Sequence, residues 1–176
     1  MILVNLFGTP GAGKSTGAAY IFSKVKMAGV NAELIGEFAK DKVWEENWKA
    51  LNNQAYIFGK QYYRISRCAD KVDVIITDSP MPLCILYNQK EALIKDGHFE
   101  NMVINVFNSY ETMNYLIKRV KPYNESGRYQ DEAGADSLLN PIRDILHDHK
   151  ICYMEYVGDQ ESYDWIARDI IDRFAT

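Results

Sequence analysis

The sequence has few cysteines and prolines and contains no long hydrophobic run. Its 176 residues include five prolines and three cysteines, Cys68, Cys84 and Cys152. An odd number of cysteines without paired spacing argues against a disulfide framework or a cysteine metal site, so reduced core thiols are expected. No apolar run reaches 18 residues, and no basic leader precedes the first apolar segment. We therefore expect a soluble, cytoplasmic protein that does not contact a membrane.

The sequence also lacks an excess of positive charge. The net charge is −4 and the isoelectric point is about 5.4, which gives no general attraction to polyanions. Any contact with nucleic acid would have to be local. The content of hydrophobic residues, 47%, and of charged residues, 25%, is that of a globular protein. The length predicts one domain over residues 1–176. The oligomeric state stays open, with a homodimer as a plausible state.

A glycine-rich segment near the amino terminus is the most specific motif. Residues 8–15 match G-x-x-x-x-G-K-[ST] at every position, after an apolar run and before a helical stretch. That order favours a phosphate-binding loop over a glycine-rich turn without a ligand. Its N–H groups turn toward phosphates, Lys14 reaches the β- and γ-phosphates, and the Ser15 hydroxyl ligates Mg²⁺. ATP and Mg²⁺ are the predicted cofactors. The predicted nucleotide-binding residues are Gly8, Thr9, Pro10, Gly11, Ala12, Gly13, Lys14, Ser15 and Thr16.

Short apolar runs alternate with longer helical patterns along the whole chain. This alternation is typical of an α/β fold with a parallel sheet and right-handed crossovers. The predicted strands are residues 2–7, 31–36, 72–78, 112–118 and 151–156. The predicted helices are residues 14–28, 40–50, 52–70, 98–109, 136–149 and 160–174. Residues 119–134 form a polar segment that is predicted to be a long, lid-like loop.

Two acidic residues follow predicted strands. Asp78 ends the apolar run 74–77, where a carboxylate could hold Mg²⁺ or its water, although aspartate also begins turns. Glu37 follows the second strand and would face Lys14 across the crevice, where it could accept the proton of an attacking hydroxyl. A glutamate favoured by the dipole of a following helix is the alternative for Glu37. After the fifth strand, Gly158 could form a turn beside the adenine, although glycine is common there.

Polar side chains share one face of the predicted helix 52–70. Gln54, Gln61, Arg64 and Arg67 lie among aromatic residues, so they could read a base and hold a phosphate. A solvated face backed by an aromatic core is an equally good interpretation.

The predicted loop carries cations that a lid could bring to the γ-phosphate. Arg119 and Arg128 are the candidate catalytic arginines, although charged runs are often only solvated surface. The accompanying polar residues are Lys118, Lys121, Tyr129 and Gln130.

Together these motifs resemble the nucleoside and nucleoside-monophosphate kinase branch of the P-loop proteins. Segments 36–41, 78–80, 121–124 and 127–128 are similar to those of short phage-encoded, kinase-like ATP-binding proteins. The resemblance implies ATP as the phosphoryl donor and the strand order 2-3-1-4-5. It also implies that Glu37 is the carboxylate that acts on the accepting sugar hydroxyl. The base-reading amide would be Gln54 or Gln61, and the lid arginines would be Arg119 and Arg128.

One position departs from that family. Such kinases usually place an arginine directly after the aspartate that ends the third strand, but this sequence has Ser79 and Pro80. A monophosphate acceptor needs positive charge near its phosphate, which Arg64 or Arg67 could supply.

The motifs predict a kinase that moves the γ-phosphoryl group of Mg·ATP to a small nucleoside or nucleotide acceptor. Two alternatives stay open. One is a kinase acting on hydroxymethylated bases in DNA, which the acidic net charge disfavours. The other is an ATP-hydrolysing switch protein without a small-molecule acceptor.

Overall fold

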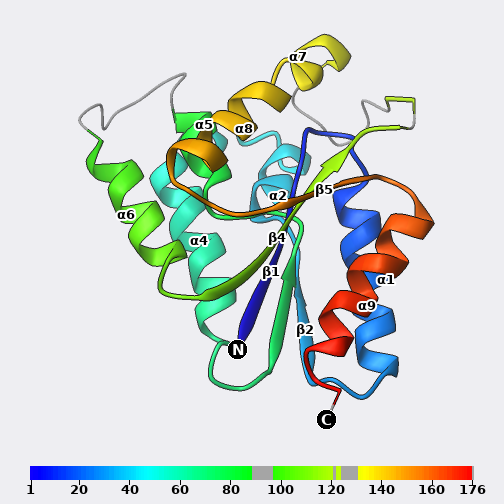
Figure 1. The fold of residues 1–176 in the computed structure, drawn as a ribbon. Helices are drawn as coiled ribbons and strands as arrows, with labels where there is room; N and C mark the ends of the chain where they lie inside the picture. The colour runs from blue at the N-terminus through cyan, green and yellow to red at the C-terminus, as the bar shows by residue number, and fades with distance from the viewer. Residues whose placement is uncertain (89–96, 121, 124–130, 176) are drawn as a thin grey trace.

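Five parallel strands form a single sheet at the centre of the molecule (Figure 1). The structure, a computed structural model, describes residues 1–88, 97–120, 122–123 and 131–175. The sheet order β2-β3-β1-β4-β5 and the parallel pairing confirm the predicted α/β P-loop fold. The strands are β1 (Ile2–Phe7), β2 (Ala32–Ile35), β3 (Val74–Thr77), β4 (Glu111–Lys118) and β5 (Met154–Val157).

The central strand β1 is buried along its whole length, which explains its continuous apolar sequence. It pairs with β3 on one side and β4 on the other, so that Asn5 lies opposite Thr77 and Asn114. On the far side of β3, Thr77 pairs with Ile35 of β2. The segments that follow β1, β2 and β3 therefore leave the sheet at the same carboxyl edge, where the predicted site residues belong.

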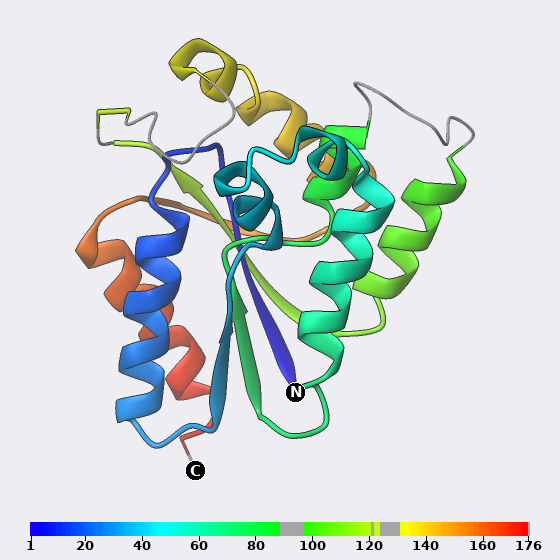
Figure 2. The same cartoon turned by 180° about the vertical axis from the view of Figure 1, so that it is seen from behind.

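Helices cover both faces of the sheet (Figures 1 and 2). One face packs against α1 (Lys14–Met27) and α9 (Gln160–Asp172) through a core that includes Ile21 and Ile166. A second core, which includes Ile65 and Leu146, lies on the other face. Its helices are α4 (Gln54–Ser66), α5 (Leu83–Asn88), α6 (His98–Phe107) and α8 (Leu139–Asp148). The remaining helices are α2 (Phe38–Trp44), α3 (Trp48–Leu51) and α7 (Glu132–Asp136).

The single helix predicted for residues 40–50 is wrong, because α2 and α3 are separate. Glu46 has a φ of 51° between them, in the left-handed region that a continuing helix cannot use. The side chain of Asn47 then accepts a 3.1 Å hydrogen bond from the N–H of Ala50 and begins α3. In the same way, the predicted helix 136–149 corresponds to the end of α7 and to α8.

Two further expectations need correction. The helix α5 was not predicted, because its six residues follow Pro80 and Pro82 and give too short a pattern. The predicted loop 119–134 ends in α7, where Asp131 accepts a hydrogen bond from the N–H of Gly134 and caps the helix. The three cysteines are free, but the expectation that all of them are core thiols is wrong. Cys84 is buried, Cys68 is half-buried, and Cys152 is exposed.

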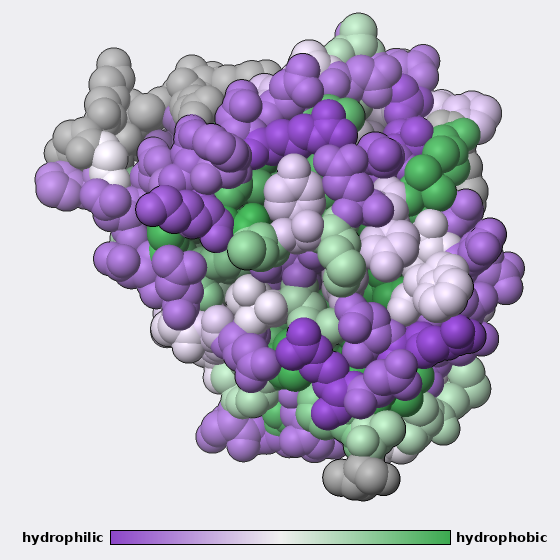
Figure 3. Space-filling model, in the orientation of Figure 1, coloured by the Kyte–Doolittle hydropathy of each residue, from purple (hydrophilic) through white to green (hydrophobic). Residues whose placement is uncertain are grey.

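Hydrophilic residues dominate the face that carries α8, β5 and α9, and hydrophobic residues appear there in small, separate areas (Figure 3). Within the described residues, every helix is too short or too polar to cross a membrane.

Candidate nucleotide-binding site

The glycine-rich loop joins β1 to α1 at the carboxyl edge of the sheet. The Nζ of Lys14 donates hydrogen bonds to the carbonyl oxygens of Gly8 at 2.9 Å and Thr9 at 3.0 Å. These bonds hold the ammonium group inside the curve of the loop. Ser15 and Thr16 lie in the first turn of α1 and are exposed. The helix thus begins with a cation and two hydroxyls at its positive end, which is an arrangement that suits phosphate oxygens.

Two glycines of the loop adopt a left-handed backbone that other residues rarely use. Gly11 has a φ of 81° and Gly13, which caps α1, has a φ of 97°. A Cβ at Gly13 would collide with the hydroxyl of Tyr163, and a Cβ at Gly11 would lie 2.9 Å from Cδ2 of Tyr123. The loop is therefore packed between a residue of α9 and a residue that follows β4.

The turn between β5 and α9 lies directly against the loop. The N–H of Gly158 donates a 2.9 Å hydrogen bond to the carbonyl oxygen of Lys118, and a Cβ at Gly158 would collide with the carbonyl oxygen of Ala12. Asp159 caps α9 by accepting a 2.9 Å hydrogen bond from the N–H of Ser162. This turn contacts the phosphate loop, while its contact with an adenine stays a prediction.

Asp78 follows β3 directly and lies beside the loop. It is 6% exposed, and its Oδ1 is buried without a hydrogen-bond partner among the described residues. A buried carboxylate oxygen usually has a partner, so this one fits a bound cation or its water. Groups of three or more His, Cys, Asp or Glu that could hold a metal do not occur in the described parts of the chain. Mg²⁺ commonly takes one or two protein ligands and shares the rest with phosphates and water, and Asp78 and Ser15 fit that pattern.

Glu37 occupies the N-cap position of α2, but its side chain makes no capping hydrogen bond. Burial raises the pKa of its carboxyl group, Lys14 lowers it, and Asp78 raises it further. The carboxyl group therefore lies within the electrostatic reach of the loop lysine and of the candidate magnesium ligand. This placement is consistent with a role for Glu37 in the site. The side chain does not cap α2 through a hydrogen bond.

The buried side chain of Gln61 holds the segment that carries Glu37. Its Oε1 accepts a 3.1 Å hydrogen bond from the N–H of Phe38. Its Nε2 lies 3.4 Å from the carbonyl oxygen of Gly36 and 3.3 Å from Oγ1 of Thr77. Both ends of the amide are thus engaged within the protein, and Gln61 acts on the site through the position of Glu37.

Arg64 supports the same segment from the next turn of α4. Its guanidinium donates to the carbonyl oxygen of Gly36 at 3.3 Å and to Asp41 at 2.7 Å, and it lies 5.0 Å from the centre of the Phe38 ring. Gln54 instead donates to the carbonyl oxygen of Leu51 and links α4 to α3.

Arg67 is not brought into the site. It is the exposed C-cap of α4. In Figure 1, α4 ends at the amino edge of the sheet, near the start of β3. The loop of Gly8 and Lys14 lies at the opposite edge. An acceptor phosphate at the carboxyl edge could therefore use Arg64 but not Arg67.

Arg119, directly after β4, is held by α7. It donates to Glu132 at 2.6 Å and to both carboxylate oxygens of Asp136 at 2.6 and 2.7 Å. Its guanidinium also lies 5.4 Å from the centre of the Tyr123 ring, which packs against Gly11. The sequence did not indicate these two carboxylates, because α7 spans the boundary between the predicted loop 119–134 and the predicted helix 136–149. Arg128, with Lys121, Tyr129 and Gln130, lies outside the described residues.

The helix α5 adds two residues that sequence reasoning also missed. Burial raises the pKa of the Cys84 thiol to about 12, and the nearby charge of Glu37 adds to the shift. Burial and Glu37 raise the pKa of the Tyr87 phenol as well. Both side chains therefore lie within the electrostatic reach of the carboxyl group of Glu37. The apolar run after Asp78-Ser79-Pro80 was the available signal for this helix.

Comparisons with known proteins agree with this fold. A family model described as AAA domain matches residues 3–162. A search of curated proteins finds no match. Among solved structures, the crystal structure of NadR protein in complex with NR is similar, with a TM-score of 0.65 and 16% sequence identity. The similarity covers 97% of this chain and 49% of that chain, so this chain spans about half the length of the NadR protein. At this identity the likeness shows the fold.

The family model covers most of the chain and includes the phosphate loop, Glu37, Asp78 and Arg119. The chain therefore belongs to the AAA domain family of P-loop nucleotide-binding proteins.

Proposed function

We propose that this protein is a phosphotransferase that moves the γ-phosphoryl group of Mg·ATP to a nucleoside or nucleotide acceptor. The placement of Glu37 is the observation that carries the proposal. Its carboxyl group shares an electrostatic environment with Lys14 and Asp78, and its pKa is raised by burial. A carboxylate with a raised pKa is a better proton acceptor near neutral pH than an exposed glutamate.

In the proposed reaction the acceptor hydroxyl attacks the γ-phosphorus in line with the leaving ADP. The new bond joins the acceptor oxygen to the γ-phosphorus, and the bond to the bridging oxygen of ADP breaks. Glu37 takes the hydroxyl proton. Lys14 and the loop N–H groups stabilise the negative charge on the transferred group. Asp78 and Ser15 would hold Mg²⁺, which supplies positive charge at the phosphate oxygens.

Two helices lie around the segment that carries Glu37. Gln61 and Arg64 of α4 hold this segment through hydrogen bonds, and Cys84 and Tyr87 of α5 lie within the electrostatic reach of its carboxyl group. The fold neighbour NadR protein is seen in complex with NR, and we propose that this chain binds a small-molecule acceptor as well as ATP.

The test is transfer of labelled γ-phosphate from Mg·ATP to a panel of nucleosides and nucleoside monophosphates, with the products separated chromatographically. The proposal expects a labelled acceptor for at least one member of the panel. Lys14→Ala should lower transfer by roughly 10²–10³-fold while circular dichroism stays that of the wild type. Release of inorganic phosphate alone, unchanged by every acceptor, would show the proposal to be wrong.

The AAA domain family match also favours a second candidate, an ATP-hydrolysing switch. In that case Glu37 would orient a water molecule in place of an acceptor hydroxyl. The same experiment separates the two functions, because the switch produces labelled inorganic phosphate at a rate that no acceptor alters.

A further inference from the structure

Positive charge is concentrated in one segment of this acidic protein. Residues 47–69 contain Lys49, Lys60, Arg64 and Arg67 and no aspartate or glutamate. This segment therefore carries a charge of +4, while the whole chain carries −4, which leaves −8 for the rest. The segment forms α3 and α4, and Gln61 of α4 accepts a hydrogen bond from the N–H of Phe38, the residue next to Glu37.

The exposed face of α4 is a continuous line of aromatic and cationic side chains. Tyr56, Lys60, Tyr63 and Arg67 follow one another at spacings of four, three and four residues, so they project from the same side of the helix. We call these four residues the α4 stripe. Tyr63 is 64% exposed and Tyr56 is 38% exposed. The Nζ of Lys60 lies 5.6 Å from the centre of the Tyr56 ring.

The opposite face of α4 accounts for the packing of the helix. Ile57, Phe58, Gln61 and Ile65 are buried against the sheet and its neighbouring helices. Lys60, Tyr63 and Arg67 of the stripe therefore lie outside the core, and exposed side chains grouped along one face of a helix form a candidate binding surface.

One end of the stripe lies against the segment that carries Glu37. The ring of Tyr56 packs edge to face on Phe38, with their centres 5.5 Å apart, and Phe38 is the neighbour of Glu37 in the chain. From there the stripe runs down α4 to Arg67 at the amino edge of the sheet, about 16 Å away at 1.5 Å per residue. Figure 2 shows α4 on the outside of the molecule along this path.

We propose that the α4 stripe binds single-stranded nucleic acid, so that a strand whose end lies at Glu37 continues along α4. Two tyrosine rings offer faces on which bases stack, and Lys60 and Arg67 lie between and after them to contact phosphates. An acidic peptide would use the cations but would leave the tyrosine faces without planar partners. Binding of nucleic acid by the α4 stripe does not depend on the proposed function. The further step, in which the end of the strand accepts the phosphoryl group at Glu37, rests on the proposed function.

The test is binding of fluorescein-labelled dT12 and rU12 to the full chain without ATP, followed by anisotropy over a range of salt concentrations. With two phosphate contacts, the logarithm of the association constant should fall with the logarithm of the salt concentration at a slope of about −1.4. Lys60→Gln and Arg67→Gln should each reduce the slope by about 0.7. Tyr63→Ala should weaken binding roughly five- to hundredfold. All three side chains are exposed, so the fold should be kept.

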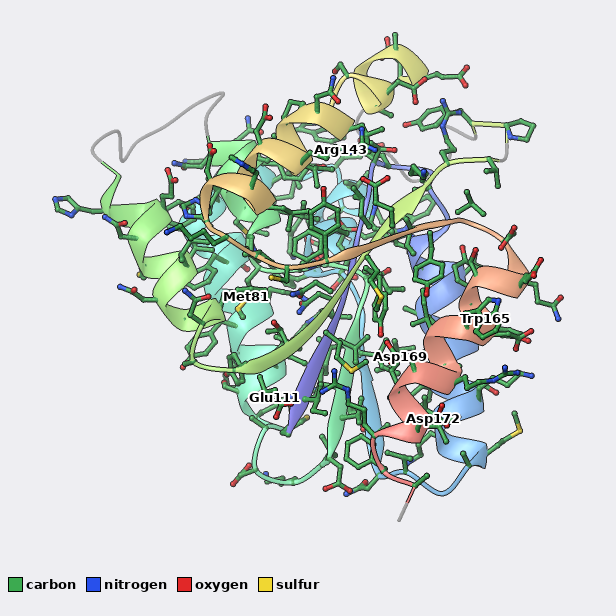
Figure 4. The ribbon with its side chains drawn as sticks, viewed as in Figure 1. Met81, Glu111, Arg143, Trp165, Asp169 and Asp172 are labelled. Carbon is green, nitrogen blue, oxygen red and sulfur yellow. The ribbon has the colours of Figure 1, made fainter. Side chains whose placement is uncertain are left out.

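The matched control is an aromatic and cationic pair on the other side of the molecule. Trp165 of α9 is 52% exposed, and the Arg168 guanidinium lies 4.9 Å from the centre of its ring. Unlike the stripe, this pair lies on a helix with several carboxylates, of which Asp169 and Asp172 are labelled with Trp165 in Figure 4. Trp165→Ala and Arg168→Gln should leave the binding of both oligonucleotides unchanged.

The outcomes separate the two proposals. The α4 stripe is supported if its variants weaken oligonucleotide binding while the α9 variants do not. The oligonucleotide that binds more tightly, dT12 or rU12, identifies the type of strand. Absence of binding at 20 mM salt, or equal loss in the stripe and α9 variants, would overturn it. An acidic peptide that binds while both oligonucleotides do not would also overturn it. Phosphoryl transfer to free nucleosides tests only the proposed function and does not depend on these results.

Discussion

The hydroxyl of Tyr163 donates a 3.0 Å hydrogen bond to the backbone carbonyl oxygen of Gly13, across 150 positions of sequence. Gly13 is the cap of α1 and the last glycine before Lys14. The ring of Tyr163 also fills the space that a Cβ at Gly17 would need, one turn further along α1. The helix α9 thus fixes the start of α1, and with it the direction in which the loop presents its N–H groups.

This packing predicts opposite effects for two glycine-to-alanine substitutions in helices. Gly17→Ala should destabilise the protein by about 1–3 kcal/mol, because its methyl group would overlap the buried ring of Tyr163. Gly59→Ala, in α4, has open space around the added methyl group and should stabilise the protein by about 0.5–1 kcal/mol. Urea unfolding measures both. Equal effects of the two substitutions would contradict the close packing at Gly17.

Glu37→Gln should separate turnover from ATP affinity. If the carboxylate takes the acceptor proton, the substitution should lower kcat by roughly 10²–10⁴-fold and change the KM for ATP little. In the wild type, activity should fall on the acid side with an apparent pKa above the ordinary 4.5 of glutamate, and this acid limb should vanish in the variant. A variant that loses ATP binding but keeps kcat would contradict the role of Glu37.

The same substitution gives a stability test that needs no substrate. The pKa of Glu37 is raised in the folded state, so the folded protein holds this proton more tightly than the unfolded chain does. The resulting contribution to the free energy of unfolding is fully present below pH 4.5 and is lost as the pH rises through the folded pKa. The Glu37→Gln variant does not lose stability in this way, because glutamine does not ionise. The free energy of unfolding of the variant minus that of the wild type should therefore increase from pH 4.5 toward neutral pH. A difference that is constant over this range would show that the pKa is not raised.

Asp78→Asn tests the magnesium site. Replacing the carboxylate should raise the Mg²⁺ concentration for half-maximal activity roughly ten- to hundredfold, because the buried Oδ1 loses its charge. The extra thermal stabilisation that Mg²⁺ gives to the ATP complex should shrink in parallel, which is a readout independent of turnover. An unchanged Mg²⁺ requirement in a folded variant would exclude Asp78 from the site.

Arg119 and Arg143 form a matched pair of ion-paired arginines. Arg143, labelled in Figure 4, binds Glu155 through two 3.0 Å hydrogen bonds, whereas Arg119 binds two residues of α7 beside the phosphate loop. Both variants should fold, because each substitution removes ion pairs whose carboxylates are at least partly exposed to solvent. Only Arg119→Ala should reduce kcat, by roughly 10²–10³-fold, if its guanidinium turns to the γ-phosphate. Equal kcat values in the two variants would show that Arg119 has no catalytic role.

Much of the fold could be predicted because its signals are local or periodic. The apolar run of β1, the glycines and Lys14 lie within a dozen residues, and their spacing alone predicts strand, loop and helix. The position of Asp78 at the end of a buried strand was predictable for the same reason. The short helices could not be predicted, because α5 has six residues and α7 has five, which are too few for a periodic pattern to repeat.

The site depends more on contacts that no local pattern contains. The sequence places Gln61 and Arg64 on one face of a helix, but only packing shows that they hold the segment of Glu37. The same helix carries Arg67 to the opposite edge of the sheet, because α4 runs antiparallel to the strands.

The sequence by itself determined that this chain has a phosphate-binding loop with a lysine and a hydroxyl, because the backbone geometry of that loop depends on glycines a few residues apart. Tertiary structure alone decided which side chains surround it. Tyr163 beneath the loop, the α7 carboxylates on Arg119 and the unpartnered oxygen of Asp78 come from segments that meet only when the sheet and its helices pack.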